Sequence, residues 1–301
     1  MRRHHIVVQH LVFILAALVS IVSGVCYAQD VRDTVKETFK VRPGGTLFLD
    51  IDHGDVEIIS ARGSEVLIEV ERIAKTSNRS AASDMFKRHD LSFEQQGGDV
   101  YVKGRYEEAG FPWSRWRDRG KLRTRVFVRV PERFNVDFRS GAGNIEISSL
   151  SGSIQGSTGA GNMKITSVQG VLDLSSGAGN VEIREAAGQI GVSTGAGNVE
   201  LRGVQGALEI RTGAGDVTAH LTRQPEGDSS LESGAGNLTV FVSQQVGVNV
   251  DAVAGMGSIQ TDFPLRVEGS WMKKSSTGSI NGGGPALHMR TGVGSVAVRK
   301  L

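Results

Sequence analysis

Short runs of alternating apolar and polar residues recur along most of this chain, each bounded by glycine. Ile145–Ile147 is one such run, and Leu172–Leu174 is a second type that follows the smaller glycine turn at Gly170. Alternation with a period of two between glycine turns predicts β-strands that bury one face. A helix would have to carry many interior glycines, each costing up to about 1 kcal/mol. The pattern therefore predicts an all-β fold.

A Gly-Ala-Gly-Asn block precedes one strand of each pair and returns at fixed intervals. Five blocks start 18 residues apart, and two more follow at intervals of 21 residues. The seven blocks begin at Ser140, Thr158, Ser176, Thr194, Thr212, Ser233 and Ala254. A shortened copy begins at Thr277 and a full copy at Thr291. Self-similarity of this kind predicts a single-stranded parallel β-helix, or β-solenoid, with 18–21 residues per coil.

Stacked coils would place equivalent residues in columns about 4.8 Å apart. The inward column is expected to be apolar throughout, and it contains Ile145, Met163, Val181, Val199, Val217, Leu238, Ile259 and Val296. The neighbouring outward column begins with Glu146, Lys164 and Glu182, so a lysine lies between two acids. Such cross-strand charge pairs contribute roughly 0.2–1 kcal/mol each.

The polar residue that ends each block has two structural interpretations. This column consists of Asn144, Asn162, Asn180, Asn198, Asp216 and Asn237. Stacked side-chain amides can form a hydrogen-bonded ladder, and asparagine also tolerates the left-handed conformation found in turns. Under either interpretation these residues serve the turn and do not bind a ligand.

Residues 29–133 break the regular repeat but keep strand-like patterns. Leu47–Ile58 predicts a first coil with a shorter turn, and Ser80–His89 predicts a short helix with Ser83 as its N-cap. A solenoid needs a cap over its first open coil. Residues 29–133 are therefore predicted to form an irregular β-rich N-terminal cap, continuous with a repeat solenoid over residues 134–301.

The coil that ends at Leu301 is expected to be the last of the stack. Its strands would then present unpaired edges to solvent, and such edges can pair with another chain. An edge-to-edge homodimer is therefore an expectation of the sequence.

The first 28 residues have the pattern of a cleaved signal peptide. Arg2 and Arg3 precede the apolar run Leu11–Val25, and the residues before Gln29 suit cleavage. The run is shorter than the roughly 20 residues of a membrane-spanning helix, although a retained anchor is the alternative. Export across the inner membrane predicts a location in the periplasm or at the cell surface.

Cleavage would leave a chain with no cysteine and a balanced charge. It removes Cys26, the only cysteine, two of the 34 basic residues and none of the 32 acidic residues, leaving 32 of each sign. A balanced charge disfavours a general nucleic-acid binder. The remaining histidines lack the spacing of metal ligands, and no cofactor or metal is predicted.

One segment of the N-terminal portion combines aromatic and basic side chains. Its candidate interaction residues are Trp113, Arg115, Trp116, Arg117, Arg119 and Lys121. Aromatic residues beside arginines are enriched where proteins bind partners, and the same mixture suits an anionic membrane surface. The alternative is an ordinary solvated excursion between two strands.

Two other functions are compatible with a parallel β-helix. A polysaccharide-cleaving enzyme needs two carboxylates roughly 5–10 Å apart, but Glu146, Glu182 and Glu200 form a regular exposed stripe without the asymmetry of an active site. Calcium-binding solenoids need several oxygen ligands per ion and a repeat of nine residues. Here the glycine-rich block appears once per 18 residues and only Asp216 replaces asparagine in the regular coils. Both alternatives are less favoured than a binding scaffold.

Three features resemble one bacterial family. They are Asp52–Ile58, the strand end Val128–Pro131, and the repeated Gly-[Asn/Asp]-apolar-x-apolar pattern. Together they resemble the bacterial "putative adhesin" family of exported β-helix domains, which is related to the Toastrack and head-GIN domains. The resemblance implies a right-handed single-stranded β-helix and offers no catalytic residues. The expected function is a non-enzymatic, adhesin-like scaffold that binds an envelope component, either protein or polysaccharide.

Overall fold

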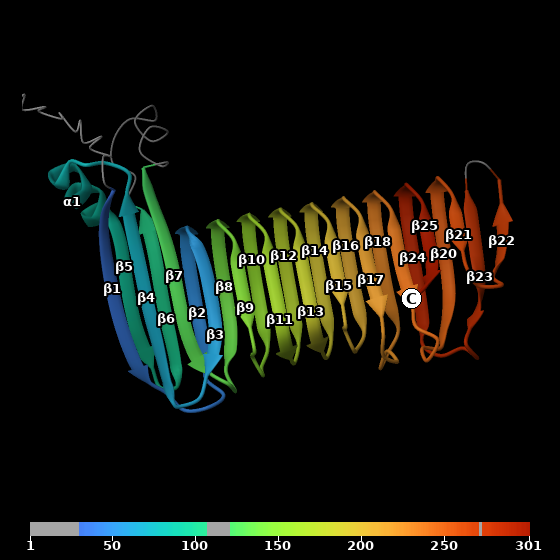
Figure 1. Cartoon of the computed structure of the whole chain (residues 1–301), viewed down its shortest axis with the longest axis horizontal. Coiled ribbons are helices and arrows are strands. Elements are labelled where there is room, and N and C mark those ends of the chain that lie inside the picture. Colours follow the sequence, from blue (N-terminus) through green and yellow to red (C-terminus); the bar gives the residue numbers. More distant parts are fainter. Residues whose placement is uncertain (1–29, 107–120, 271–272) are drawn as a thin grey trace, which may run out of the picture.

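The computed structural model describes residues 30–106, 121–270 and 273–301. Most of these residues lie in two long sheets, sheet A with 12 strands and sheet B with 13. Figure 1 shows the strands side by side along an elongated stack, with the one helix of the described residues at one end. The predicted all-β solenoid is confirmed.

Each regular coil contributes one strand to each sheet. The sheet B strands are β2 (Thr46–His53), β8 (Asn135–Ala142), β10 (Ile154–Ala160), β12 (Leu172–Ala178), β14 (Ile190–Ala196), β16 (Leu208–Ala214) and β18 (Ser229–Ala235). The sheet A strands are β3 (Asp55–Ala61), β9 (Ile145–Ser148), β11 (Met163–Gln169), β13 (Val181–Ala187), β15 (Val199–Arg202), β17 (Val217–Leu221) and β19 (Leu238–Val242). The coils of this region are therefore two-sided.

Equivalent residues of successive coils pair in parallel register, as the 18-residue repeat predicts. Met163 pairs with Ile145 on one side and Val181 on the other, and all three are buried. Valine, isoleucine and leucine fill most of the space between the sheets because period-two alternation turns every second side chain inward. The core is therefore continuous along the stack, and both outer faces are left to polar side chains.

The N-terminal cap wraps around the first coil. A coil formed by β6 (Asp99–Tyr106) and β7 (Leu122–Pro131) stacks outside β2 and β3, so the first coil in sequence is not the first in space. Antiparallel strands then extend both sheets: β4 (Glu65–Ala74) and β1 (Val31–Lys40) in sheet A, and β5 (His89–Gln96) in sheet B.

The helix of the cap is α1 (Arg79–Arg88), close to its predicted position. Its N-cap is Asn78, whose side chain accepts hydrogen bonds from the N–H groups of Ser80 and Ala81. The prediction of Ser83 as the N-cap is wrong, because the helix begins four residues earlier and Ser83 lies inside it.

The C-terminal coils are also stacked out of sequence order. Strands β24 (Ala286–Val293) and β25 (Val296–Lys300) insert between the β18–β19 coil and the coil of β20 (Val248–Met256) and β21 (Ile259–Thr261). The inward column therefore runs Leu238, Val296, Ile259, and the expected order Leu238, Ile259, Val296 is wrong. The shortened copy at Thr277 is not a coil turn, because it lies in β23 (Lys274–Ile280), which pairs antiparallel with β20 and with β22 (Arg266–Gly269).

Because of this stacking order, the open edges of the sheets are not at the strands nearest the C-terminus. Strand β25 lies between β19 and β21, so the expectation that the Leu301 coil is last is wrong. Within the described residues, sheet A ends at β1 and β21, and sheet B ends at β5 and β22. Burying the final strands inside the stack pairs their backbone groups on both sides.

Candidate interaction surfaces

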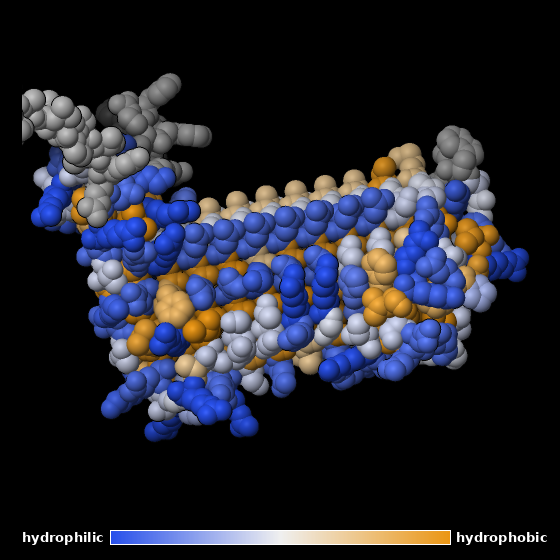
Figure 2. All heavy atoms as spheres, viewed as in Figure 1, coloured by the Kyte–Doolittle hydropathy of each residue, from blue (hydrophilic) through white to orange (hydrophobic). Residues whose placement is uncertain are grey.

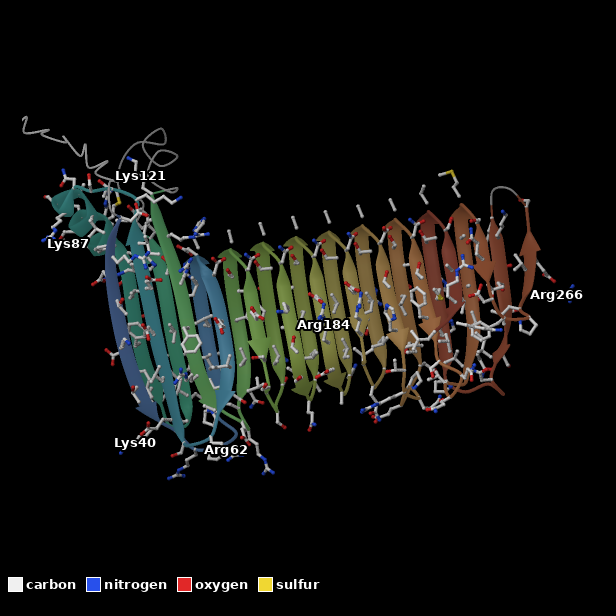
Figure 3. The ribbon with its side chains drawn as sticks, viewed as in Figure 1. Lys40, Arg62, Lys87, Lys121, Arg184 and Arg266 are labelled. Atoms are coloured by element: carbon white, nitrogen blue, oxygen red, sulfur yellow. The ribbon has the colours of Figure 1, made fainter. Side chains whose placement is uncertain are left out.

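The segment rich in tryptophan and arginine lies almost wholly outside the described residues. Its members there are Trp113, Arg115, Trp116, Arg117 and Arg119. Lys121 is described, and its carbonyl accepts a 2.7 Å hydrogen bond from the N–H of Lys75. Figure 3 shows Lys121 at the same end of the molecule as Lys87 of α1. In sequence, the segment connects β6 to β7.

The Asn/Asp column of the turn is joined by hydrogen bonds along the stack. The N–H of Asn180 donates to Oδ1 of Asn162 at 3.0 Å, and the N–H of Asn198 donates to Oδ1 of Asn180 at 2.9 Å. Asp216 accepts in the same way from the N–H of Asn237 at 2.7 Å. In each of these links, a side-chain oxygen accepts from a backbone N–H of the next coil. Both Asn and Asp supply such an oxygen.

A column of buried hydroxyls lies under the same turn, and the sequence analysis missed its role. Its members are Ser140, Thr158, Ser176, Thr194, Thr212, Ser233 and Thr291, all at least nine-tenths buried. Several donate to turn carbonyls, as Ser233 does to Gly215 at 3.0 Å and Thr291 to Gly236 at 2.8 Å. The repetition of Ser or Thr before nearly every block was the available signal.

The residue between the two glycines of each block points away from the core. The column runs Ala142, Ala160, Ala178, Ala196, Ala214, Ala235, Val293 and Met256. Val293 and Met256 are 47% and 61% exposed. Figure 2 shows this ridge as a pale apolar row along the upper edge, behind a polar row. The ridge is one residue wide and follows the turns.

Ion pairs cover the middle of the outer face of sheet A. Lys164 pairs with Glu146 at 2.7 Å. Glu182 pairs with Arg184 on its own strand, and Glu200 pairs with Arg202. The three acids considered for a glycosidase therefore each have a basic partner, so the stripe holds no pair of free carboxylates of the kind that such an enzyme needs.

This charged pattern stops in the C-terminal third of sheet A. The outward column that runs Glu57, Glu146, Lys164, Glu182, Glu200 continues as Thr218, Thr239, Ala297 and Gln260. In the adjacent column, Arg202 is followed by His220 and then Phe241. Their rings stack with centroids 4.6 Å apart. An aromatic pair thus replaces charged side chains at equivalent positions.

The change in side-chain size creates a groove of about 520 Å³, which we call the C-terminal groove. Its floor column is Thr218, Thr239, Ala297 and Gln260, and Phe241 lies along one side. The Asn/Asp column lies along the other, with Asp216 and Asn237. Figure 2 shows apolar atoms near this end of the viewed face, between polar rows.

The charged groups of the C-terminal groove balance one another. Asp262 forms a 2.9 Å ion pair with Arg299 and accepts from the N–H of Lys300. The hydrogen bond from Arg299 lowers the pKa of Asp262. The ammonium of Lys300 lies 5.7 Å from the ring centroid of Phe263. With Asp216, the lining holds two acids and two bases, so the groove carries no net charge.

A second groove of about 560 Å³ crosses sheet A near the N-terminal cap. It is lined by Glu57, Glu69, Glu71, Arg125 and Phe127, among others. Glu69 pairs with Lys36 at 3.0 Å, and Glu71 lies between Arg32 and Arg125. Most of the acidic side chains that line this second groove thus already form ion pairs within the protein.

His89 is the titratable side chain that departs furthest from ordinary behaviour among the described residues. It is 6% exposed, and its Nδ1 has no hydrogen-bond partner. Burial, reinforced by the nearby charge of Arg72, lowers its pKa to about 4. Beside the C-terminal groove, where His220 stacks on Phe241, burial and the charge of Arg202 lower the pKa of His220. Neutral imidazole is therefore favoured at both positions.

Two further features are absent from the described part of the chain. There, no three His, Cys, Asp or Glu side chains converge on a position that could hold a metal ion. No helix in residues 30–106, 121–270 or 273–301 has the length and apolar character needed to cross a membrane.

Comparison with known proteins places the fold in a family. The family described as Toastrack DUF4097 matches residues 46–299, most of the chain. The chain belongs to the Toastrack family. The predicted relationship to Toastrack domains is therefore confirmed. No curated protein matches the sequence.

Solved structures similar to this Toastrack chain come from several bacteria. One is described as a "putative cell adhesion protein" from Clostridium sporogenes, with 15% identity, a TM-score of 0.29, and coverage of 89% of this chain and 100% of that chain. Another is a "putative adhesin" from Bacteroides fragilis, with 10% identity, a TM-score of 0.36, and coverage of 88% and 97%. A third is a "putative lipid binding protein" from Parabacteroides distasonis, with 11% identity, a TM-score of 0.37, and coverage of 89% and 97%.

Proposed function

We propose that this Toastrack protein is a non-enzymatic binding scaffold of the cell envelope, with an adhesin-like role. The observation that carries the proposal is the form of the stack: two continuous sheets hold outward side chains in fixed columns. Long repetitive faces of this kind suit extended partners. The partner would be an envelope protein or polysaccharide.

The arrangement of the acids supports a binding role over hydrolysis. Glu146, Glu182 and Glu200 each have a basic neighbour, and they repeat from coil to coil. Catalytic carboxylates of glycosidases instead differ from each other in their surroundings, so that one is held protonated and the other ionised.

The proposed location rests on the predicted signal peptide of residues 1–28. Export would place the scaffold in the periplasm or on the cell surface, where envelope polymers and anionic lipid headgroups are accessible. Fractionation of cells that produce the full-length chain tests this part directly. Recovery of a shortened protein in the periplasmic or surface fraction is expected, and an unprocessed protein confined to the cytoplasm would contradict it.

Sedimentation with envelope fractions tests the binding role. We expect the exported protein to pellet saturably with envelope from the producing cells. A variant with Trp113, Trp116, Arg115 and Arg117 all changed to Ala tests the segment that the sequence singled out, and vesicles of anionic lipid form a parallel arm. Loss of pelleting in the variant assigns contact to that segment. Equal pelleting of both proteins assigns it to the outer faces, and no pelleting of the parent contradicts the proposed role.

A further inference from the structure

The C-terminal groove is the surface on which the repeat departs most clearly from its own pattern. Five stacked positions of one outward column are charged, and the next three are Thr218, Thr239 and Ala297. Short side chains there contribute nothing to the core, because they face outward. They leave an open floor that a Glu or Lys would fill, as at Lys164 in the same column.

The aromatic side of the groove also lies outside the core. Phe241 alternates with the buried residues Val240 and Val242, so it points to the outer face and is only half-buried. The equivalent positions on the preceding strands are Arg184 and Arg202, followed by His220. An apolar ring at an outward position has no core to join, and beside the uncharged floor of this groove it favours a role in contacting a ligand. The outward Phe127 instead lies between Glu57 and Glu69.

The polar side supplies hydrogen-bonding groups at fixed positions. Oδ1 of Asp216 already accepts from Asn237, while no hydrogen bond from the described residues reaches its Oδ2. The Thr218 and Thr239 hydroxyls on the floor can both donate and accept. The strands β17, β19 and β25 are paired on both sides, so recognition there has to use side chains.

These features match the chemistry of a sugar chain. A pyranose ring has an apolar face of C–H groups and a rim of hydroxyls that both donate and accept. An apolar side chain that faces a carboxylate across a floor with hydroxyl groups satisfies both parts, and the balanced charge of the lining favours an uncharged ligand. The floor column spans four coils, about 14 Å at the ~4.8 Å spacing of strands, which suits a short stretch of a linear polymer.

We propose that the C-terminal groove binds a neutral polysaccharide chain along the stack, with Phe241 and Ala297 against the sugar rings and Asp216, Thr218 and Thr239 hydrogen-bonded to the hydroxyls. The inference rests on the proposed binding function and names the ligand class. The neutral form of His220 is consistent with it, because that ring supports Phe241 without adding charge.

Affinity electrophoresis of the exported protein tests this. Native gels would contain mixed-linkage β-glucan, mannan, arabinoxylan or dextran, with polygalacturonate as the acidic comparison. We expect at least one neutral polymer to retard the protein. Phe241→Ala should raise the apparent Kd about three- to tenfold. Thr239→Lys, which places in the groove the residue found at the equivalent Lys164, should abolish retardation while preserving the fold.

Phe127→Ala is the matched control, since Phe127 is another half-buried phenylalanine on the outer face of sheet A. It should leave retardation unchanged, and urea midpoints of all variants should show that they are folded. Absence of retardation by every neutral polymer would overturn the proposal. So would retardation by polygalacturonate alone, or equal retardation of the wild-type, Phe241→Ala and Thr239→Lys proteins.

Envelope sedimentation separates this inference from the broader function. Envelope would be treated with protease or with periodate, which cleaves sugar diols, before the protein is added. Loss of pelleting after periodate alone supports a glycan ligand. Loss after protease alone shows a protein partner, which overturns the glycan inference and leaves the binding scaffold intact. No pelleting with untreated envelope would contradict the broader function itself.

Discussion

At the scale of single residues, the glycines of the turn have a steric cause. Gly161 has a φ of +139°, and a Cβ built on it would lie 2.1 Å from the carbonyl oxygen of Gly143 in the preceding coil. The close approach of stacked turns therefore leaves no room for a side chain, independently of the backbone conformation. The same contact recurs from coil to coil, which explains why the sequence repeats the glycine so regularly.

We expect Gly161→Ala to lower the free energy of unfolding by about 2 kcal/mol or more, because it adds both backbone strain and a clash. Gly191→Ala is the control. Gly191 lies in β14 without a positive φ, and its added Cβ would be no closer than 3.6 Å to the nearest atom. Its effect should stay within about 0.5 kcal/mol in urea unfolding. Equal effects of the two substitutions would refute the steric explanation.

His89 makes stability depend on pH. Its pKa is about 4 in the folded protein, against 6.5 for the unperturbed side chain. Protonation therefore favours the unfolded chain. The contribution is fully present above pH 6.5 and is lost as the pH falls toward 4, by up to about 3 kcal/mol.

Thermal unfolding between pH 7 and pH 4 would measure this loss. We expect His89→Leu to flatten the pH dependence, whereas His53→Leu, at the exposed end of β2, should leave it as in the wild type. The same pH dependence in the wild-type and His89→Leu proteins would show that another group is responsible.

At the scale of elements, the turn column works mainly through backbone N–H groups, although the side-chain amides of Asn144, Asn162 and Asn237 also donate, at 3.2–3.4 Å. Its oxygens each accept from the next coil, and Asp55 does so at the start of the column, from Asn144 at 3.1 Å. The sequence predicted a column of stacked polar side chains, but it could not show whether amide N–H groups or backbone N–H groups donate. The occurrence of Asp among the asparagines was the available signal, since a carboxylate has no N–H.

This arrangement predicts different effects for two substitutions of Asn180. Asn180→Ala removes the acceptor for Asn198 and should cost about 0.5–1.5 kcal/mol. Asn180→Asp keeps an oxygen there and should cost less, as Asp216 occupies the equivalent position. Urea midpoints would compare them. A larger loss for Asn180→Asp than for Asn180→Ala would indicate that the amide N–H matters more than the oxygen.

At the scale of the whole molecule, the repeat predicted the strands, the inward column and the two-strand coil. It could not predict the order of the coils at either end. Near-identical coils offer similar apolar columns, so the local pattern does not distinguish a neighbour in sequence from a later coil. The C-terminal groove was also missed, although the break in the charged column at Thr218 and the outward Phe241 were visible in the sequence.

Cysteine pairs would test the order of the coils. In a Cys26→Ser background, Thr239→Cys with Ala297→Cys should form a disulfide on mild oxidation, because these residues are partners on adjacent strands. Thr239→Cys with Gln260→Cys should not, because β25 lies between their strands. Non-reducing gels would show the cross-link. A disulfide in the second pair without one in the first would mean that the coils stack in sequence order.

The most direct test of a non-enzymatic binding scaffold measures binding and turnover together. Purified exported protein would be incubated with envelope from the producing cells, and both the bound protein and newly released soluble sugars or peptides would be followed over time. We expect saturable binding with no release above that of a protein-free control. Progressive release of fragments in proportion to the amount of protein would contradict the proposed function and show that the protein is an enzyme.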